Sequence, residues 1–519
     1  MTASASRRRL LLGGAAAVAT SVAAPALRAA PASAATYAPN PYRATPLPTA
    51  QQRHYLSRLG CGLSRTSFAA MVADGGETAW FERQLAPASV PESATALALP
   101  GWYPDLADAP ATRWSKHVAG AKQSWKYAEN LAACSMLRQV YSTRQLLETM
   151  VGFWSDHLHV HANADLGWVH RSTYDDTIRA HALGRFDDLL VATALHPAML
   201  LYLDNWRSVR GAPNENHGRE LLELHTVGRG SGYTETMVKD SARILSGYTV
   251  DAHNTWAGYY DPARHTTGTV KVLGFAAPND APDGQQLAVD YLRYLARHPA
   301  TAQSVARRLA RRFVSDAPSS ALVGAVAQTF RDSGTDIRAT LRTLVAHPEF
   351  AASTNRLVRT PVEDFVATCR VLEVAAAPPT SDLSFARSCV WSLESTLPHH
   401  WPRPDGSPVG NPAWSSASRM LSSFRMHWNL AAGWYPTVDV TYRTPASWLP
   451  QPSIRLDQYV DHLCRVLLGK GSDSRLLTAA VTATGYGPTT VLTRDHPVCT
   501  WMFVRLLGTL LDSPDHMRR

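Results

Sequence analysis

The segment NENHGRELLELHTVG, residues 214–228, carries the clearest information about the fold. Asn214 is a favoured N-cap residue, Glu215 places a negative charge in the first helical turn, and Gly228 suits the left-handed conformation that follows many helices. The segment therefore predicts one helix that begins after Asn214 and ends before Gly228. Its three glutamates, one arginine, two histidines and two asparagines surround three leucines. That composition indicates either a solvated helix face or the wall of a polar site.

The next segment repeats this design. In YTETMVKDSARILSG, residues 233–247, Thr234 is the expected N-cap, Glu235 follows it, and Gly247 ends the pattern. Two punctuated helices with a short connection predict a helical hairpin.

Helical patterns cover most of the remaining chain, from residue 51 onward and again over residues 299–350. Residues 251–285 are the least helical and predict a small β-ribbon or an irregular segment. Residues 397–416, LPHHWPRPDGSPVGNPAWSS, predict a long ordered loop rich in Trp and Pro. The predicted fold class is therefore mainly α, a multi-helical globular unit that carries this ribbon and this loop.

The first residues are predicted to be an export signal. Residues 1–34 contain Arg7, Arg8 and Arg9, then an apolar stretch, and they end in the small residues Ala32, Ser33 and Ala34. This order is typical of a twin-arginine signal peptide, so we expect a secreted or extracytoplasmic protein. Residues 35–50 are rich in Pro and Ala and predict a linker, and residues 51–519 predict one helical domain.

The charge of the chain gives no indication of a nucleic-acid partner. Removing residues 1–34 removes four arginines and no acidic residue, so the formal net charge falls from +9 to +5. The densest basic run, ARRLARRF, places Arg307, Arg308, Arg311 and Arg312 on adjacent turns of one helix, which we interpret as a solvated face. No later segment has the apolar length that a membrane span needs.

The glutamates of the 214–228 helix have a spacing that suits acid/base chemistry. On a helix, Asn216, Glu220, Glu223 and Val227 fall on one broad face. Two neighbouring carboxylates do not both ionise easily, so one of them keeps a proton. Such a pair protonates a leaving oxygen while its second member activates water or attacks, as in glycosidases.

Two other interpretations of this helix remain open. Glu215, Arg219 and Glu223 have the i,i+4 spacing of a surface ion ladder, which contributes only about 0.3–0.5 kcal/mol per pair. Alternatively, Glu220, Glu223 and His157 bind a divalent metal whose open position activates water, although neither Glu-x-x-His nor His-Glu-x-x-His occurs there.

The motifs occur in an order that resembles one bacterial family. The segments concerned are FWSDHLHV, NENHGRELLELHTVG, YTETMVKDSARILSGY, HTTGTVKVLG, VARRLARRFVSDAP, TPVEDFVATCRVLE and WPRPDGSPVGNPAW. They are similar to motifs of the family called domain of unknown function 1800, and the resemblance spans most of residues 51–519. It implies an exported bacterial protein without a known activity. Genes of such members often lie beside those of a family that looks like sulfatases and phosphatases, which implies a shared pathway on an extracellular polymer.

The chain departs from the family pattern at several positions. Members tend to read Phe-Trp-His-Asn-His where this chain has FWSDH, residues 153–157, so the first histidine is missing and His157 remains. An aromatic residue and an alanine are usual where this chain has His217 and Gly218. His225 varies in the family, whereas His265 falls on one of its motifs.

We therefore expect a secreted hydrolase that acts on an extracellular or cell-envelope polymer, in the first place a polysaccharide, by paired-carboxylate catalysis. Glu220 and Glu223 would be the pair, and His157 and Glu215 would orient or tune them. The predicted substrate-binding residues are Asn214, Asn216, Arg219, Trp154 and His265. One alternative is a non-catalytic binding or scaffold partner of a sulfatase-like exported protein, marked by ion-paired glutamates without a cavity beside them. The other is a metal-dependent hydrolase or oxidase with the same glutamates as ligands to a divalent metal.

Overall fold

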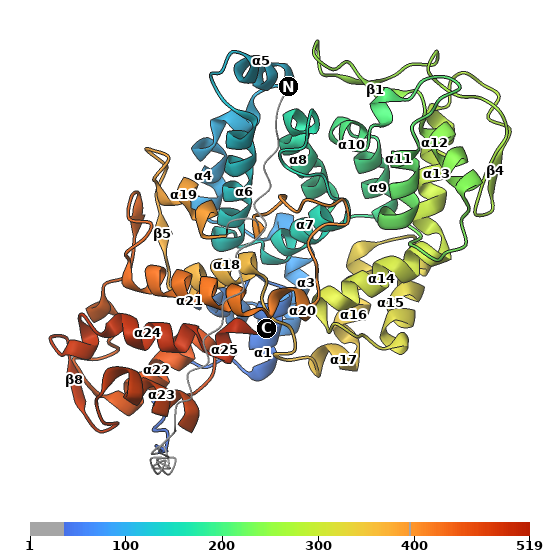
Figure 1. Cartoon of the computed structure of the whole chain (residues 1–519). Helices are drawn as coiled ribbons and strands as arrows, with labels where there is room; N and C mark the ends of the chain where they lie inside the picture. Colours follow the sequence, from blue (N-terminus) through green and yellow to red (C-terminus); the bar gives the residue numbers. More distant parts are fainter. Residues whose placement is uncertain (1–35, 394–395) are drawn as a thin grey trace, which may run out of the picture. The chain divides into compact units, whose positions relative to one another are not determined.

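Helices make up most of the chain, which confirms the predicted mainly α class (Figure 1). The computed structural model describes residues 36–393 and 396–519. The first ten helices are α1 (Ala50–Arg58), α2 (Arg65–Ala73), α3 (Glu77–Gln84), α4 (Ala94–Trp102), α5 (Pro110–Val118), α6 (Ser124–Tyr141), α7 (Gln145–His157), α8 (Arg171–His181), α9 (Phe186–Ala194) and α10 (Pro197–Tyr202). Pro197 opens α10 at its first turn, as its fixed backbone angle favours.

The predicted helical hairpin is present. It consists of α11 (Glu215–Glu220), a π-helical turn (Leu221–His225) and α12 (Glu235–Leu245), and α11 packs against α12. Both expected N-caps form, because the Asn214 side chain accepts a hydrogen bond from the Asn216 amide and the Thr234 hydroxyl accepts one from the Met237 amide. Only the π-helical turn was not predicted.

Two short antiparallel hairpins follow, as the alternating pattern of residues 251–285 allows. The first pairs β1 (Tyr248–Val250) with β2 (Gly258–Tyr260), and Thr249 lies opposite Tyr259. The second pairs β3 (Val270–Val272) with β4 (Phe275–Ala277), and Lys271 lies opposite Ala276. The second hairpin packs through β3 on α12.

A second helical block lies between these hairpins and residue 351. Its members are α13 (Gln285–Arg297), α14 (Pro299–Phe313), α15 (Ser320–Asp332), α16 (Ile337–Ala346) and α17 (Pro348–Ala351). Neighbouring helices of the block pack in sequence order, and α13 also packs on α9. The buried side chains of α14 include Val305, Leu309 and Phe313, which recur at the spacing of one helix face.

The last part of the chain contains α18 (Pro361–Val371), β5 (Ala375–Ala376), α19 (Phe385–Ser388), α20 (Asn411–Trp414), α21 (Ala417–Ala432), β6 (Val440–Thr441), β7 (Ser453–Arg455), α22 (Leu456–Leu468), α23 (Ser474–Thr484), β8 (Val491–Thr493), α24 (Phe503–Leu511) and α25 (Pro514–Met517). The strands pair as β5 with β6 and β7 with β8, both antiparallel. Helix α18 packs on α6 and α21, and α21 packs on α24. Helix α18 thus joins the last helices to a helix from the first half of the chain.

Residues 37–519 form one compact unit. The segment predicted as a linker is extended but held in place, because the Tyr42 amide donates to Asp461 (2.7 Å) and the Thr45 hydroxyl lies 2.6 Å from a ring nitrogen of His462, both on α22. No described helix has the length and apolar character needed to cross a membrane. The predicted export signal lies outside the described residues.

Candidate functional site

The π-helical turn forms the C-terminal part of the glutamate-rich helix. Between Leu221 and His225 the chain leaves α-helical hydrogen bonding, and the Thr226 hydroxyl donates to the Leu221 carbonyl at 2.7 Å. The helix ends where expected, with Gly228 at a φ of 83°. Turns of this kind are rare and occur often at functional sites, and this one begins directly after Glu220 and contains Glu223.

Glu220 and Glu223 have different surroundings. Glu220 is partly buried and makes no hydrogen bond or ion pair with any described residue. Its pKa is raised by burial and, to a smaller extent, by the negative charge of Glu223. Glu223 pairs with Arg229 at 2.8 Å. Although burial alone would raise the pKa of Glu223, hydrogen bonds from Tyr233 and Arg229 hold it below its ordinary value. The two carboxyl groups therefore titrate in opposite directions from the ordinary glutamate.

The other charged residues of the helix form ion pairs on its more exposed side. Arg219 lies 3.4 Å from Glu215, which confirms the predicted i,i+4 pair, and 2.7 Å from Glu235 of α12. The predicted contact of Arg219 with Glu223 is not among its ion pairs, because Arg219 turns toward α12 and Glu223 toward Arg229. Asn216 is exposed, whereas the Asn214 side chain caps the helix.

The other predicted site residues are buried. A ring nitrogen of His157, Nε2, lies 3.1 Å from the carbonyl oxygen of His225, so His157 ties the end of α7 to the π-helical turn. Trp154 is fully buried and its indole donates to the Ala182 carbonyl at 3.0 Å, so its ring faces the core and not a substrate. His265 is also fully buried, between the Ser246 carbonyl (2.8 Å) and Asn279 (2.7 Å).

Two further histidines of this helix are enclosed without partners. Neither ring nitrogen of His217 or of His225 has a hydrogen-bond partner among the described residues, and both side chains are almost completely buried. Burial lowers the pKa of His217 to about 4 and that of His225 to about 3, so both imidazoles are neutral near pH 7. Their unpaired nitrogens make this region unusual, since buried polar atoms are normally satisfied.

The predicted Trp/Pro-rich loop crosses the end of α7. The Ser407 amide donates to the carboxylate of Asp156 at 3.3 Å, and Arg308 of α14 donates to the carbonyls of Asp156 (3.0 Å) and Asp405 (3.3 Å). The charge of Asp405 also contributes to the raised pKa of Glu220. This loop therefore approaches Glu220 through Asp405 and lines a cavity through Ser407.

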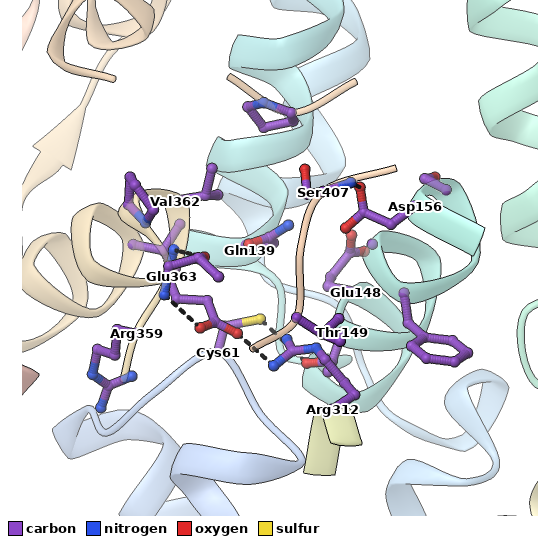
Figure 2. A pocket seen from close by; sticks show the side chains of 18 of the residues that line it. Cys61, Gln139, Glu148, Thr149, Asp156, Arg312, Arg359, Val362, Glu363 and Ser407 are labelled. Atoms are coloured by element: carbon purple, nitrogen blue, oxygen red, sulfur yellow. Dashed lines mark hydrogen bonds and ion pairs between the residues drawn. The ribbon is translucent and has the colours of Figure 1, made fainter. Parts of the chain in front are cut away.

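That cavity is enclosed by α7, α14, the start of α18 and the loop, and has a volume of about 130 Å³ (Figure 2). Figure 2 shows Asp156 and Ser407 on one side of it and Arg312, Glu363 and Cys61 on another. None of the predicted site residues lines it. Two of its acidic residues nevertheless fall in motifs of the sequence, Asp156 in FWSDH and Glu363 in TPVED, so a signal was present but was assigned to no role.

Arginine–carboxylate pairs make up much of the cavity wall. Arg179 forms two hydrogen bonds with Glu148, at 2.7 and 3.0 Å, and Glu363 pairs with both Arg312 (2.5 Å) and Arg519 (3.1 Å). The wall also includes Arg308 and Arg359, so cationic side chains outnumber carboxylates in it.

Asp156 differs from the other two carboxylates because it forms no ion pair with a described residue. Burial raises its pKa, and the positive charge of Arg308 opposes this effect. The neighbouring hydroxyl of Ser155 also lines the cavity and has no hydrogen-bond partner. The cavity thus offers one protonatable carboxyl group and one free hydroxyl beside positive charge.

The interpretation of the ARRLARRF run as a solvated face is wrong for two of its four arginines. Arg308 and Arg312 line the cavity, and Arg307 alone of the four is exposed. The error arises because α14 is covered on two sides, by its neighbouring helices and by the loop near residue 405. Buried arginines that are paired follow the same spacing as solvated ones.

The glutamates do not belong to a compact set of metal-ligating groups. In the described parts of the chain, the set of three or more such side chains whose ligand atoms lie within 4.8 Å of one another consists of Asp364, His427 and His516. His157 also contacts a backbone carbonyl through one of its ring nitrogens.

A family model described as protein of unknown function (DUF1800) matches residues 54–518. The chain belongs to the DUF1800 family. This confirms the resemblance seen in the sequence motifs, across nearly the whole chain. No curated protein and no solved structure matches the sequence.

Proposed function

We propose that this DUF1800 protein is a hydrolase that cleaves an extracellular or cell-envelope polymer, in the first place a glycan. Glu220 would donate a proton to the leaving oxygen, and Glu223 would activate water or attack the sugar carbon. Together the two steps need two carboxyl groups near the scissile bond that hold different protonation states at the same pH.

The opposite pKa shifts of Glu220 and Glu223 carry this proposal. Burial and a neighbouring negative charge favour a protonated Glu220, whereas Arg229 and Tyr233 favour an ionised Glu223. Pairs of carboxyl groups whose surroundings separate their pKa values are the usual arrangement for acid/base catalysis. Hydrogen bonds between neighbours on a surface ion ladder would instead lower the pKa of every carboxylate in it.

The side chains near Glu220 and Glu223 suit a sugar, which has polar groups and a ring that can stack on an aromatic side chain. Tyr202 and Tyr233 are partly exposed. Burial raises the phenol pKa of each to about 12, together with the negative charge of Glu220 for Tyr202 and of Glu223 for Tyr233. Both tyrosines therefore lie near the two glutamates. Asn216 adds an exposed amide to the same helix. Aromatic faces and amides are the groups with which proteins commonly hold sugars. In this proposal His157 has a positioning role, since its ring contacts the π-helical turn.

The proposal includes export through a twin-arginine signal and a sulfatase-like partner that acts on the same polymer. The basic and apolar segments of residues 1–34 support the export, and the partner rests on the family resemblance alone. A sulfatase-like enzyme would remove charged groups from a glycan that the hydrolase then cleaves.

Asp156 is a second candidate for the same acid/base chemistry. It is the cavity carboxyl group without an ion pair to a described residue, and burial raises its pKa. A substrate group that enters the cavity would meet this carboxyl group beside Arg308.

A non-catalytic binding role is the remaining alternative, and the ion pairs of Glu215 and Glu223 favour it. A single set of variants separates the three possibilities. Mature protein would be incubated with a panel of bacterial and algal polysaccharides, and release of reducing ends would be measured.

We expect Glu220→Gln and Glu223→Gln each to reduce the rate at least 100-fold, with an unchanged melting temperature. Glu235→Gln is the matched control. Glu235 is an exposed glutamate on α12, and it pairs with Arg219 of α11, the helix that carries Glu220. Loss of activity in Asp156→Asn together with full activity in Glu220→Gln would move the reaction to the cavity. Polymer binding without cleavage by any form would establish the binding role.

A further inference from the structure

Three side chains converge at a buried point away from the glutamate helix. Asp364 lies on α18, His427 on α21 and His516 on α25, and all three are buried. The Nε2 atom of His427 lies 3.1 Å from Oδ1 of Asp364, and the Nε2 atom of His516 lies 3.7 Å from the same oxygen. Three potential ligand atoms from three helices therefore surround one point.

Their spacing matches the edges of a tetrahedral metal site. Bonds of about 2.0–2.1 Å to nitrogen and oxygen place neighbouring ligand atoms about 3.3 Å apart, between the two observed distances. The same geometry places the centres of two histidine rings about 5 Å apart. The rings of His427 and His516 are 5.3 Å apart and nearly perpendicular.

The outer atoms of the ligands are held by other residues, which orients the inner atoms. Asp512 lies 2.7 Å from Nδ1 of His427, so this carboxylate fixes the ring with Nε2 pointing inward. The second carboxylate oxygen of Asp364, Oδ2, accepts a hydrogen bond from Ser423 (2.7 Å) and lies 3.2 Å from Arg419. Carboxylate–histidine–metal arrangements of this kind are the usual support around a bound metal.

The charges of the cluster allow a cation at its centre. Asp364 and Asp512 contribute two negative charges, and Arg419 contributes one positive charge. Although burial alone would lower the pKa of His427, Asp364 and Asp512 raise it to about 9, so without a metal a proton on His427 balances the second carboxylate. A divalent metal binds the neutral imidazole and would take the place of this proton.

We propose that Asp364, His427 and His516 bind one zinc-type divalent cation. Two imidazole nitrogens and one carboxylate oxygen are ligands that zinc accepts. The Thr368 hydroxyl lies 2.9 Å from Nε2 of His516 and would give up this hydrogen bond when the nitrogen binds the cation. The cation would join α18 and α21 to the last helix, α25, and so stabilise the fold.

This proposal is independent of the hydrolase proposed above, because none of the three ligands contacts the glutamate helix. The first experiment is elemental analysis of the full-length protein, purified without chelators from zinc-supplemented medium. We expect about one equivalent of zinc in the wild-type protein and at least a tenfold lower content in His516→Gln. His54→Gln is the matched control, because His54 is a buried histidine whose hydrogen bonds and ring contact are with Phe350 and Ser353 and not with the three ligands.

Two measurements on the wild-type protein keep the test valid if His516→Gln does not fold. After treatment with a chelator, addition of zinc should raise the melting temperature by about 4 °C, since the metal binds the folded state only. Cobalt in place of zinc should give the visible absorption of a tetrahedral nitrogen and oxygen site.

Wild-type protein that contains no metal and does not respond to zinc would overturn the proposal. A protonated His427 between Asp364 and Asp512 would then supply the positive charge. Metal that persists in His516→Gln would also overturn it, and would direct attention to His217 and His225, whose ring nitrogens have no partners.

Discussion

Gly406 packs directly against the carbonyl oxygen of Asp156, so closely that a Cβ atom at position 406 would overlap it. The residue has a φ of 71°, in the left-handed region that favours glycine. This contact brings the Ser407 amide to the Asp156 carboxylate and closes the loop over the cavity.

Replacing Gly406 with alanine should therefore open this contact. We expect Gly406→Ala to lower the free energy of unfolding by about 2 kcal/mol or more, from backbone strain and from steric overlap together. Urea denaturation measures the change. Gly232→Ala is the control, because Gly232 has a similar φ of 86° but open space around it, and should cost only about 1 kcal/mol. Equal effects in the two variants would show that the loop moves freely away from Asp156.

The opposite pKa shifts of the glutamate pair predict a bell-shaped pH profile. Activity should fall as the pH drops through the pKa of Glu223, below 4.5, and as it rises through the pKa of Glu220, above 4.5. Arg229→Ala removes the ion pair that keeps Glu223 ionised, so the acid limb should move to higher pH. The logarithm of kcat/KM plotted against pH would show this shift.

Arg229 also lowers the pKa of Glu220, so the alkaline limb should move in the same direction by a smaller amount. Arg207→Ala, which removes an exposed arginine paired with Asp204, should leave both limbs in place. An unchanged acid limb in Arg229→Ala would remove Glu223 from the mechanism.

Asp187 should make stability depend on pH at the acid end. Its carboxylate is fully buried and pairs with Arg185, Arg293 and Arg297. Burial alone would raise the pKa of this carboxyl group, but hydrogen bonds from Arg185 and Arg297 lower it to about 2. A carboxyl group with a lowered pKa contributes stability above its unfolded pKa of 3.8, and this contribution is lost as the pH falls toward 2.

Because the arginines are partly exposed, we expect Asp187→Asn to cost about 1–2 kcal/mol at pH 7 and much less near pH 2. Denaturant unfolding at several pH values measures this difference. A cost that is the same at both ends of the range would show that Asp187 acts through its shape and not through its charge.

The unpartnered ring of His217 predicts a stabilising substitution. His217→Leu keeps a similar volume and removes two buried nitrogens that have no hydrogen-bond partner. We expect the free energy of unfolding to stay constant or to rise by about 1 kcal/mol. A loss of more than about 2 kcal/mol would show that these nitrogens bind a water molecule or an ion. His170→Leu is the comparison, since Nε2 of His170 contacts the Trp256 carbonyl at 2.8 Å and its removal should be costly.

Local signals in the sequence predicted the local structure well. The caps at Asn214 and Thr234 and the end at Gly228 depend only on a few neighbouring residues, and all three are present. The ribbon and the long loop followed from residue types in the same way. The π-helical turn could not be predicted, because it accompanies a contact between His157 and the His225 carbonyl from a different helix.

The cavity and the buried cluster needed information that no local pattern contains. Arg308 and Arg312 have the spacing of a solvated helix face, but a distant loop contacts Arg308 and Glu363 of α18 pairs with Arg312. Asp364 and His516 are separated by about 150 positions in the chain, so no motif spacing brings them together. Such sites become visible only when the tertiary structure is known.

The pairing of Arg519 with Leu357 has a consequence for biosynthesis. Each backbone amide donates to the carbonyl of the other, at 3.2 and 2.8 Å, and the Arg519 side chain reaches Glu363 in the cavity wall. A nascent chain cannot complete this wall until Arg519 has left the ribosome. Assembly of the cavity therefore follows the synthesis of residues 357–519 and cannot begin while the first helices alone have been made.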